Sequence, residues 1–260
     1  GHQPGPQGPI TDFEAIQVAE DSGNLVVLGY RDVNVEPNGV LASQGNVTIG
    51  ASRDLNINAA VPVDNAGKLT TLIAGNMITA TQTIGTAGTG NLMLVAGGGV
   101  NVNTNVAVLS GSLQDSTPRT GVLAGGQTAT GTFAVTNSSA LIVGGPQTNN
   151  EVTNVSFDGT KGIVYDATTP LTRAGIVSSS VVGSMAPAFG NIAVATSSGN
   201  LTIDQHVAST TTGGTISLTG AQDVVFSALS TDSAQSTHAK TTGTVNVTAI
   251  GGSIVNASGL

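Results

Sequence analysis

Residues 23–35 read GNLVVLGYRDVNV, and residues 45–57 read GNVTIGASRDLNI, the same pattern 22 residues later. Each segment holds two short stretches in which apolar and polar residues alternate. Such alternation is typical of a β-strand with one buried face. The distance between the two stretches is the same in both segments. The repeated unit is therefore a pair of short strands.

This pair recurs along most of the chain, at first with a period of 22 or 23 residues, in units that begin near residues 23, 45, 67, 90, 131, 190, 214 and 243. A repeat of this length indicates a solenoid, in which each unit buries the apolar face of its neighbour. A weaker third apolar stretch follows some units, for example at 39–42 and 205–208. We predict an all-β chain that forms a single-stranded parallel β-helix, with coils of about 22 residues stacked about 4.8 Å apart.

The composition agrees with a stacked coil and limits the partners. The chain has 36 Gly, five Phe and two Tyr, but no Cys or Trp, so its core must consist mainly of aliphatic side chains. The net charge of −8 argues against a nucleic-acid partner, because nucleic acids require a basic patch. Mean hydropathy is +0.21, yet no apolar run has the length of a membrane-spanning helix.

The two ends of the chain differ from the repeats between them. Residues 1–12 consist largely of Pro, Gly and Gln without alternation, which indicates a tag remnant or linker before a β-helix over 13–260. The last residues follow a strand pattern directly and include no capping element. Because solenoids need polar caps, we expect a monomeric fragment of a longer repeat array.

Two interruptions of the period, at 103–130 and 144–189, predict excursions from the coil, of which the first is either an enlarged loop or one degenerate coil. The second contains apolar stretches at 151–157 and 162–165 around Asp158-Gly159-Thr160-Lys161, a good turn signal for a β-hairpin outside the helix. Loops on a rigid scaffold often carry function. The candidate ligand-binding residues are therefore Phe157, Asp158, Lys161, Tyr165, Asp166 and Arg173. The alternative is an excursion that only packs on the helix.

The stretches Gly45-Asn46-Val47-Thr48-Ile49 and Asp54-Leu55-Asn56-Ile57-Asn58 resemble repeats of the filamentous haemagglutinin family, which comprises two-partner-secretion exoproteins and related bacterial adhesins. The resemblance covers 23–108 well and 190–258 loosely. The turn at 36–40 is similar to the Asn-Pro-Asn-Gly turn of the family's secretion domain, although Glu36 replaces the first Asn. The resemblance implies a right-handed coil, an extracellular or cell-surface location, and export through an outer-membrane transporter.

Parallel β-helices also include carbohydrate-active enzymes, so the carboxylates need a separate assessment. Asp32 and Asp54 are one coil apart in the same register, about 5 Å from each other, which suits a polysaccharide lyase or a glycoside hydrolase. Arg31 and Arg53 flank them. The alternative, which we favour, is a surface row in which the basic residues offset the repulsion between the acidic ones.

Asparagines recur at equivalent places in the repeats, and we expect them on successive coils, where stacked amides hydrogen-bond to one another and fix the register. The two rows are Asn24, Asn46 and Asn91, and Asn34, Asn56 and Asn101. No metal site is expected, because the three His are far apart and calcium-loop patterns are absent. No cofactor motif is present either.

The sequence thus favours a structural or adhesive segment of a bacterial exoprotein that serves as a stalk. The excursion at 144–189 is the expected contact surface, and a host or bacterial surface glycan or protein is the expected partner. A carbohydrate-active enzyme is the alternative. Thr-rich runs at 70–71, 79–83 and 210–215 leave an ice-binding protein as a minor alternative, although their register is not constant.

Overall fold

The computed structural model describes residues 16–17, 23–29, 31–37, 41–42, 45–59, 61, 68–82, 84, 90–96, 99–102, 112–114, 132–144, 147–152, 170–173, 175–178, 191–209, 213–227 and 239–257. Within these ranges the secondary structure is β throughout, and no helix occurs. Accordingly, this part of the chain contains no helix that could cross a membrane.

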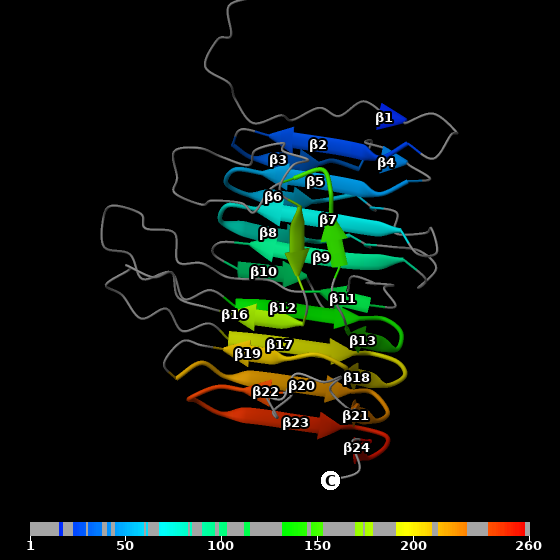
Figure 1. Cartoon of the computed structure of the whole chain (residues 1–260), viewed down its shortest axis with the longest axis vertical. Coiled ribbons are helices and arrows are strands. Elements are labelled where there is room, and N and C mark those ends of the chain that lie inside the picture. Colours follow the sequence, from blue (N-terminus) through cyan, green and yellow to red (C-terminus); the bar gives the residue numbers. More distant parts are fainter. Residues whose placement is uncertain are drawn as a thin grey trace, which may run out of the picture.

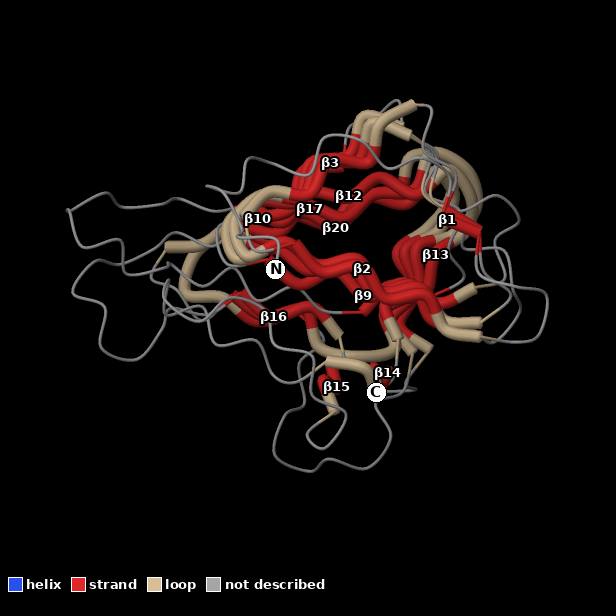
Figure 2. Tube along the Cα trace, turned by 90° about the horizontal axis from the view of Figure 1, so that it is seen from above, coloured by secondary structure: helices blue, strands red, loops and turns tan. Residues whose placement is uncertain are grey.

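Two large parallel sheets lie face to face, with the apolar core between them (Figures 1 and 2). The eight-stranded sheet contains, in spatial order, β3 (Val33–Val35), β6 (Leu55–Ile57), β8 (Met77–Ala80), β10 (Gly99–Val102), β12 (Thr132–Asn137), β17 (Asn191–Thr196), β20 (Ile216–Gly220) and β23 (Val245–Ala249). The nine-stranded sheet contains β2 (Leu25–Gly29), β5 (Val47–Ala51), β7 (Leu69–Ala74), β9 (Asn91–Ala96), β11 (Ser112–Gln114), β13 (Leu141–Val143), β18 (Leu201–Ile203), β21 (Val224–Phe226) and β24 (Ile254–Asn256).

Three smaller sheets complete the described structure. A parallel sheet beside the large ones contains β16 (Ile176–Ser178), β19 (Val207–Ser209) and β22 (Ala239–Lys240). A parallel pair is formed by β1 (Ile16–Gln17) and β4 (Leu41–Ala42), and an antiparallel pair by β14 (Gln147–Asn149) and β15 (Leu171–Arg173). The third apolar stretches predicted at 39–42 and 205–208 thus overlap β4 and β19.

Strand register follows the repeat found in the sequence. Val33 of β3 is opposite Leu55 of β6, and Leu25 of β2 is opposite Val47 of β5, so each strand pairs with its equivalent one unit later. We call one such layer of strands a rung. The prediction of an all-β chain of parallel strands in stacked sheets is confirmed.

The core is a set of aliphatic columns that run from rung to rung. Leu55, Ile57 and Ile78 are fully buried in the eight-stranded sheet, and Ile49 and Leu72 are fully buried in the nine-stranded sheet. Burial of a side chain of this size contributes about 1.5–3 kcal/mol. Because each column repeats the same kind of residue, the alternation in the sequence determines which face of every strand enters the core.

The order in which the chain visits the two sheets changes along the stack. From β2 to β10, the longer strand of each unit lies in the nine-stranded sheet and is followed by a shorter one in the eight-stranded sheet. From β12 onward the longer strand lies in the eight-stranded sheet. The tight turns therefore change side, and Figure 1 shows them on the left in the upper half and on the right in the lower half.

The smaller parallel sheets, β1 with β4 and β16 with β19 and β22, also lie at different places before and after this change. In Figure 2, β1 and β16 lie at opposite ends of the large sheets.

The strand β11, which falls within the first interruption of the period, pairs with β9 and β13 and so adds one strand to the nine-stranded sheet. The described pairing across this change is short, with two residue pairs between β10 and β12 and two between β11 and β13.

The second interruption contains one described antiparallel strand pair, which lies next to the predicted hairpin in the sequence. We predicted strands at 151–157 and 162–165 around a turn at 158–161. The described pair joins 147–149 to 171–173, with Thr148 opposite Thr172, because residues 147–152 have a binding surface on the large sheet. Apart from residues 151–152, the predicted strands and turn lie outside the described residues, so the predicted hairpin stays a prediction.

Candidate functional site

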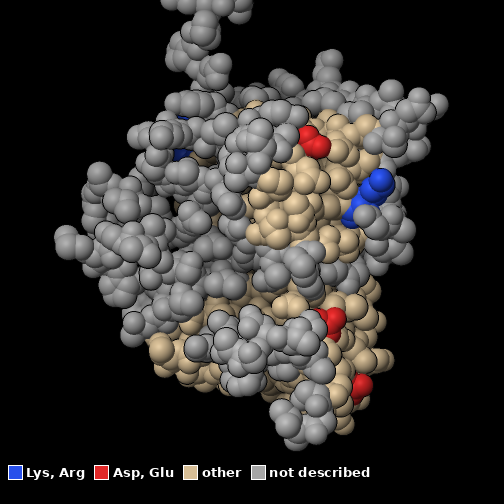
Figure 3. Space-filling model, viewed as in Figure 1, with Lys and Arg blue, Asp and Glu red and all other residues tan. Residues whose placement is uncertain are grey.

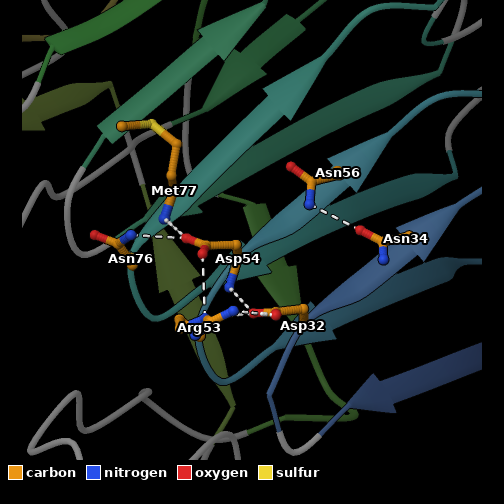
Figure 4. Close-up of polar contacts among 7 residues, drawn as sticks. All are labelled: Asp32, Asn34, Arg53, Asp54, Asn56, Asn76 and Met77. Atoms are coloured by element: carbon orange, nitrogen blue, oxygen red, sulfur yellow. Dashed lines mark hydrogen bonds and ion pairs between the residues drawn. The ribbon is translucent and has the colours of Figure 1, made fainter. Parts of the chain in front are cut away.

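The carboxylates of Asp32 and Asp54 are joined by a basic side chain, Arg53 (Figure 4). The Arg53 guanidinium donates to both carboxylate oxygens of Asp32, at 2.6 Å from Nε to Oδ1, and its Nε lies 3.3 Å from Asp54 Oδ2. Asp32 is 8% exposed. The hydrogen bond between Arg53 and Asp32, and then the negative charge of Asp32, raise the pKa of Arg53. Because that pKa is raised on folding, the stability linked to the Arg53 charge is lost as the pH rises into the strongly alkaline range.

Further hydrogen bonds link these carboxylates to the next rung. Asp32 Oδ1 accepts the Asp54 backbone N–H at 3.3 Å, while Asp54 Oδ1 accepts the side-chain amide of Asn76 at 2.7 Å and the Met77 backbone N–H at 3.3 Å. Each carboxylate thus ties its own rung to the next. This geometry favours the structural interpretation of the Asp-Arg row over a pair of carboxylates that act on a sugar.

Loss of Arg53 should reverse the effect of added salt on the stability that this row contributes. In an Arg53→Gln variant, two carboxylates one rung apart repel each other, so added NaCl should raise the urea midpoint by screening that repulsion. In the native chain NaCl should weaken the ion pairs instead. Arg31→Gln is the matched control, because Arg31 is exposed and makes no ion pair among the described residues. Equal salt responses in the two variants would contradict this assignment.

The predicted asparagine rows are present in part, and two kinds of contact form them. Asn56 Nδ2 donates to Asn34 Oδ1 at 2.8 Å, which is the expected amide-to-amide bond. By contrast, Asn24 Oδ1 accepts the backbone N–H of Asn46 at 3.0 Å, and Asn46 Oδ1 accepts that of Leu69 at 2.9 Å. These side chains therefore act as acceptors for the next rung.

Both rows are interrupted after their second member, contrary to the expectation of successive coils. Leu69 lies between the rungs of Asn46 and Asn91, and Thr79 lies between those of Asn56 and Asn101. The reason is that the third unit substitutes Leu and Thr at these register positions. Asn91 bonds instead to the excursion, with Nδ2 at 2.9 Å from Gln147 Oε1. For Asn101 only the backbone is described.

The strand β14 crosses the rungs of the nine-stranded sheet on its outer face. Gln147 contacts Asn91 of the fourth rung, Asn149 contacts the third and second rungs, and Glu151 accepts from Asn24 of the first rung at 2.6 Å. Figure 1 shows β14 and β15 roughly perpendicular to the rungs behind them. Four extended residues and three rung spacings both span about 14 Å, so the match of lengths explains one contact per rung.

Asn149 is the central polar contact of this arrangement. Its amide donates to Thr48 Oγ1 at 2.7 Å and to Thr71 Oγ1 at 2.8 Å, while its Oδ1 accepts the Glu151 backbone N–H at 2.8 Å. Asn149 is 2% exposed, and both threonines are fully buried. A buried amide with all of these partners fixes the position of residues 147–152 on the sheet.

Apolar contacts extend the docking on both sides of Asn149. Val152 and Leu171 are fully buried, and they form a second apolar cluster with outward-facing residues of β7 and β9, namely Leu69, Ile73, Met93 and Val95. The backbone N–H of Leu171 donates to the carbonyl oxygen of Val152 at 3.1 Å. We call residues 147–152 together with 170–173 the clasp.

The clasp forms the base of the segment that carries most of the predicted binding residues. The chain leaves the clasp at Val152 and re-enters it at Pro170, and the hydrogen bond from Leu171 to Val152 closes this base. Phe157, Asp158, Lys161, Tyr165 and Asp166 lie outside the described residues. Arg173 is placed only by its backbone, opposite Gln147.

Our sequence interpretation missed the surface on which the clasp docks. In β12 and β17 the buried positions alternate, whereas β7 is buried at every position and β9 at all but its first. The signal was the apolar character of outward positions in the third and fourth units, at Ile73, Met93 and Val95. A strand that is apolar on both faces predicts a second covering layer.

The charge and metal-binding character of the described surface is low. Figure 3 shows the Asp, Glu, Lys and Arg side chains of the clasp face standing apart from one another. No group of three or more His, Asp or Glu that could hold a metal ion occurs among the described residues.

Comparisons with family models, with curated proteins and with solved structures gave no match. A function for this chain must therefore be inferred from its own sequence and geometry.

Proposed function

We propose that the stacked sheets are the faces of one right-handed parallel β-helix, and that this helix is a structural and adhesive segment of a bacterial cell-surface or secreted exoprotein. Parallel strands joined by crossovers within one sheet are almost always right-handed, which supports the hand. The strand repeat supports the resemblance to filamentous haemagglutinin repeats. Export through an outer-membrane transporter is part of this proposal.

The observation that carries the adhesive part is the anchored base of the segment 153–169. The clasp ties both ends of this segment to a sheet of stacked rungs through Asn149, Val152 and Leu171. The segment holds two of the seven Phe and Tyr residues of the chain, Phe157 and Tyr165, together with Lys161. Amphipathic aromatic and charged side chains on a rigid scaffold suit recognition of a surface glycan or protein.

The proposal is tested by replacing 153–169 with a short Gly-Ser turn and leaving the clasp intact. Because Val152 and Leu171 are hydrogen-bonded neighbours, a short turn can close this gap. We expect the native chain to bind a component of an array of glycans and matrix proteins, and the variant to lose that binding at least about tenfold, as expected for removal of anchor residues. Circular dichroism must first show that both chains are folded.

A second variant separates the side chains from the segment as a whole. Phe157→Ser combined with Tyr165→Ser should reproduce most of the loss, whereas Thr148→Ser, on the exposed side of the clasp, should not. Equal binding by all variants would place the contact surface elsewhere on the stack. Absence of binding by the folded native chain would leave only the stalk role.

A further inference from the structure

The clasp is joined to the stack through two glycines that lie next to each other. Gly144 directly follows β13 and Gly175 directly precedes β16, and the backbone N–H of Gly175 donates to the carbonyl oxygen of Gly144 at 3.1 Å. Gly175 has a φ of 68°, which glycine adopts without the strain that another residue would incur. We call these two residues the neck. The chain thus leaves the stack for the clasp and returns from it at one place.

The neck is fixed to the rung on the side away from the surface that the clasp covers. The backbone N–H groups of Asp204 and Gln205 donate to the carbonyl oxygen of Val143 at 2.9 and 3.1 Å, and that of Ile176 donates to the carbonyl oxygen of His206 at 2.8 Å. These acceptors and donors connect β13 and β16 to the segment between β18 and β19. The attachment of the neck therefore does not depend on β5, β7 or β9.

The clasp is held together by its backbone, whereas its described contacts with the sheet beneath it are made by side chains. Three residue pairs join β14 to β15, and the N–H of Leu171 donates to the carbonyl oxygen of Val152. Gln147, Asn149 and Glu151 reach the sheet through side-chain hydrogen bonds, and Val152 and Leu171 through apolar contacts. Neighbouring rungs are joined instead by continuous strand pairing. The clasp can therefore leave the sheet as a unit while the strand pairing stays intact.

We propose that the clasp is a releasable strap, which opens about the neck and closes again while the stack stays folded. Such local opening costs less free energy than global unfolding, because only the contacts of the clasp are lost. The neck keeps the open clasp near its docking surface, and this high effective concentration favours closing. Opening exposes the apolar outer face of β7 and β9, on which Figure 1 shows β14 and β15. The inference is independent of binding through residues 153–169.

Oxidation of Met93 by dilute hydrogen peroxide measures the opening. Met93 is fully buried in the apolar cluster beneath the clasp, so its thioether becomes a sulfoxide only when that cluster opens. We expect the oxidation rate of the native chain, followed by mass spectrometry, to be nearly independent of urea at low concentration, because opening exposes little surface compared with global unfolding. Met77 on β8, in the other large sheet and partly exposed, is the internal control.

Two variants assign the opening to the clasp. Asn149→Ala removes the donor to two buried hydroxyls and should accelerate the oxidation of Met93 at least about thirtyfold. Asn150→Ala, at an exposed neighbouring position, should change that rate by no more than about twofold. The oxidation rate of Met77 should be the same in both variants and in the native chain.

A cross-link that holds the clasp closed tests the motion directly. The side chains of Asn24 and Glu151 meet at 2.6 Å, at the end of the clasp away from Gly144, and the chain contains no Cys. In an Asn24→Cys and Glu151→Cys double variant, a short bis-maleimide link should reduce the oxidation of Met93 to the rate of global unfolding, whereas capping with N-ethylmaleimide should not. Native oxidation that follows global unfolding at every urea concentration, equal rates in Asn149→Ala and Asn150→Ala, or no effect of the link would each overturn the proposal.

Discussion

The Asn149→Ala variant is expected to lose about 2–4 kcal/mol of unfolding free energy, although it changes one polar side chain on the outside of the sheet. The substitution removes the donor to the hydroxyls of Thr48 and Thr71, which are fully buried. A buried polar group left without its partner costs about 1–3 kcal/mol, and two such groups are affected here. Urea denaturation followed by circular dichroism measures the loss.

The neighbouring residue provides the control for this prediction. Asn150 is exposed, so Asn150→Ala removes a side chain of the same type and leaves the buried bonds intact. Its unfolding free energy should remain close to that of the native chain. Hydrogen exchange should show faster exchange in β7 and β9 only in Asn149→Ala. Similar losses in both variants would mean that the clasp contributes little to stability.

The Phe133→Ala variant is expected to lose about 3–5 kcal/mol, the usual cost of a large cavity in a packed core. Phe133 is fully buried on β12, opposite Val100 of β10 and Ile192 of β17. It therefore lies where the tight turns change side and where the described pairing between successive strands is short.

The same substitution at Phe226 is the comparison, because Phe226 on β21 is only partly buried and packs at the margin of the core. Phe226→Ala should cost clearly less than Phe133→Ala. Phe133→Leu should restore most of the stability by filling part of the cavity. If Phe133→Ala and Phe226→Ala were equally stable, the change of side would not be the sensitive point of the stack.

The clasp and the change of side are connected by the path of the chain. The clasp follows β13, which lies beyond the change, but it docks on β5, β7 and β9, which lie before it. Its contacts at Asn149 join residues 101 and 78 positions apart in the sequence. The clasp therefore links the two halves of the stack across the place where they are joined by short strand pairing.

Inference from the sequence succeeded where each residue's neighbour is set by the repeat. The alternation in 23–35 and 45–57 identified the strands and their inward faces, and the 22-residue period placed Asn34 beside Asn56 and Asp32 beside Asp54. It could not show that Arg53 would pair with both carboxylates. That contact depends on the rotamer the side chain takes between two rungs.

The sequence by itself determined the stacking of the first four units, because their repeat of 22 or 23 residues makes the residue one unit away the nearest neighbour in space. Only the tertiary structure decided the side on which the tight turns lie and the surface that receives the clasp. Both depend on segments far apart in the chain, such as Asn149, which bonds to Thr48, and Leu171, which shares an apolar cluster with Met93. No local pattern specifies such a pair, since its energy arises only when both surfaces are already formed.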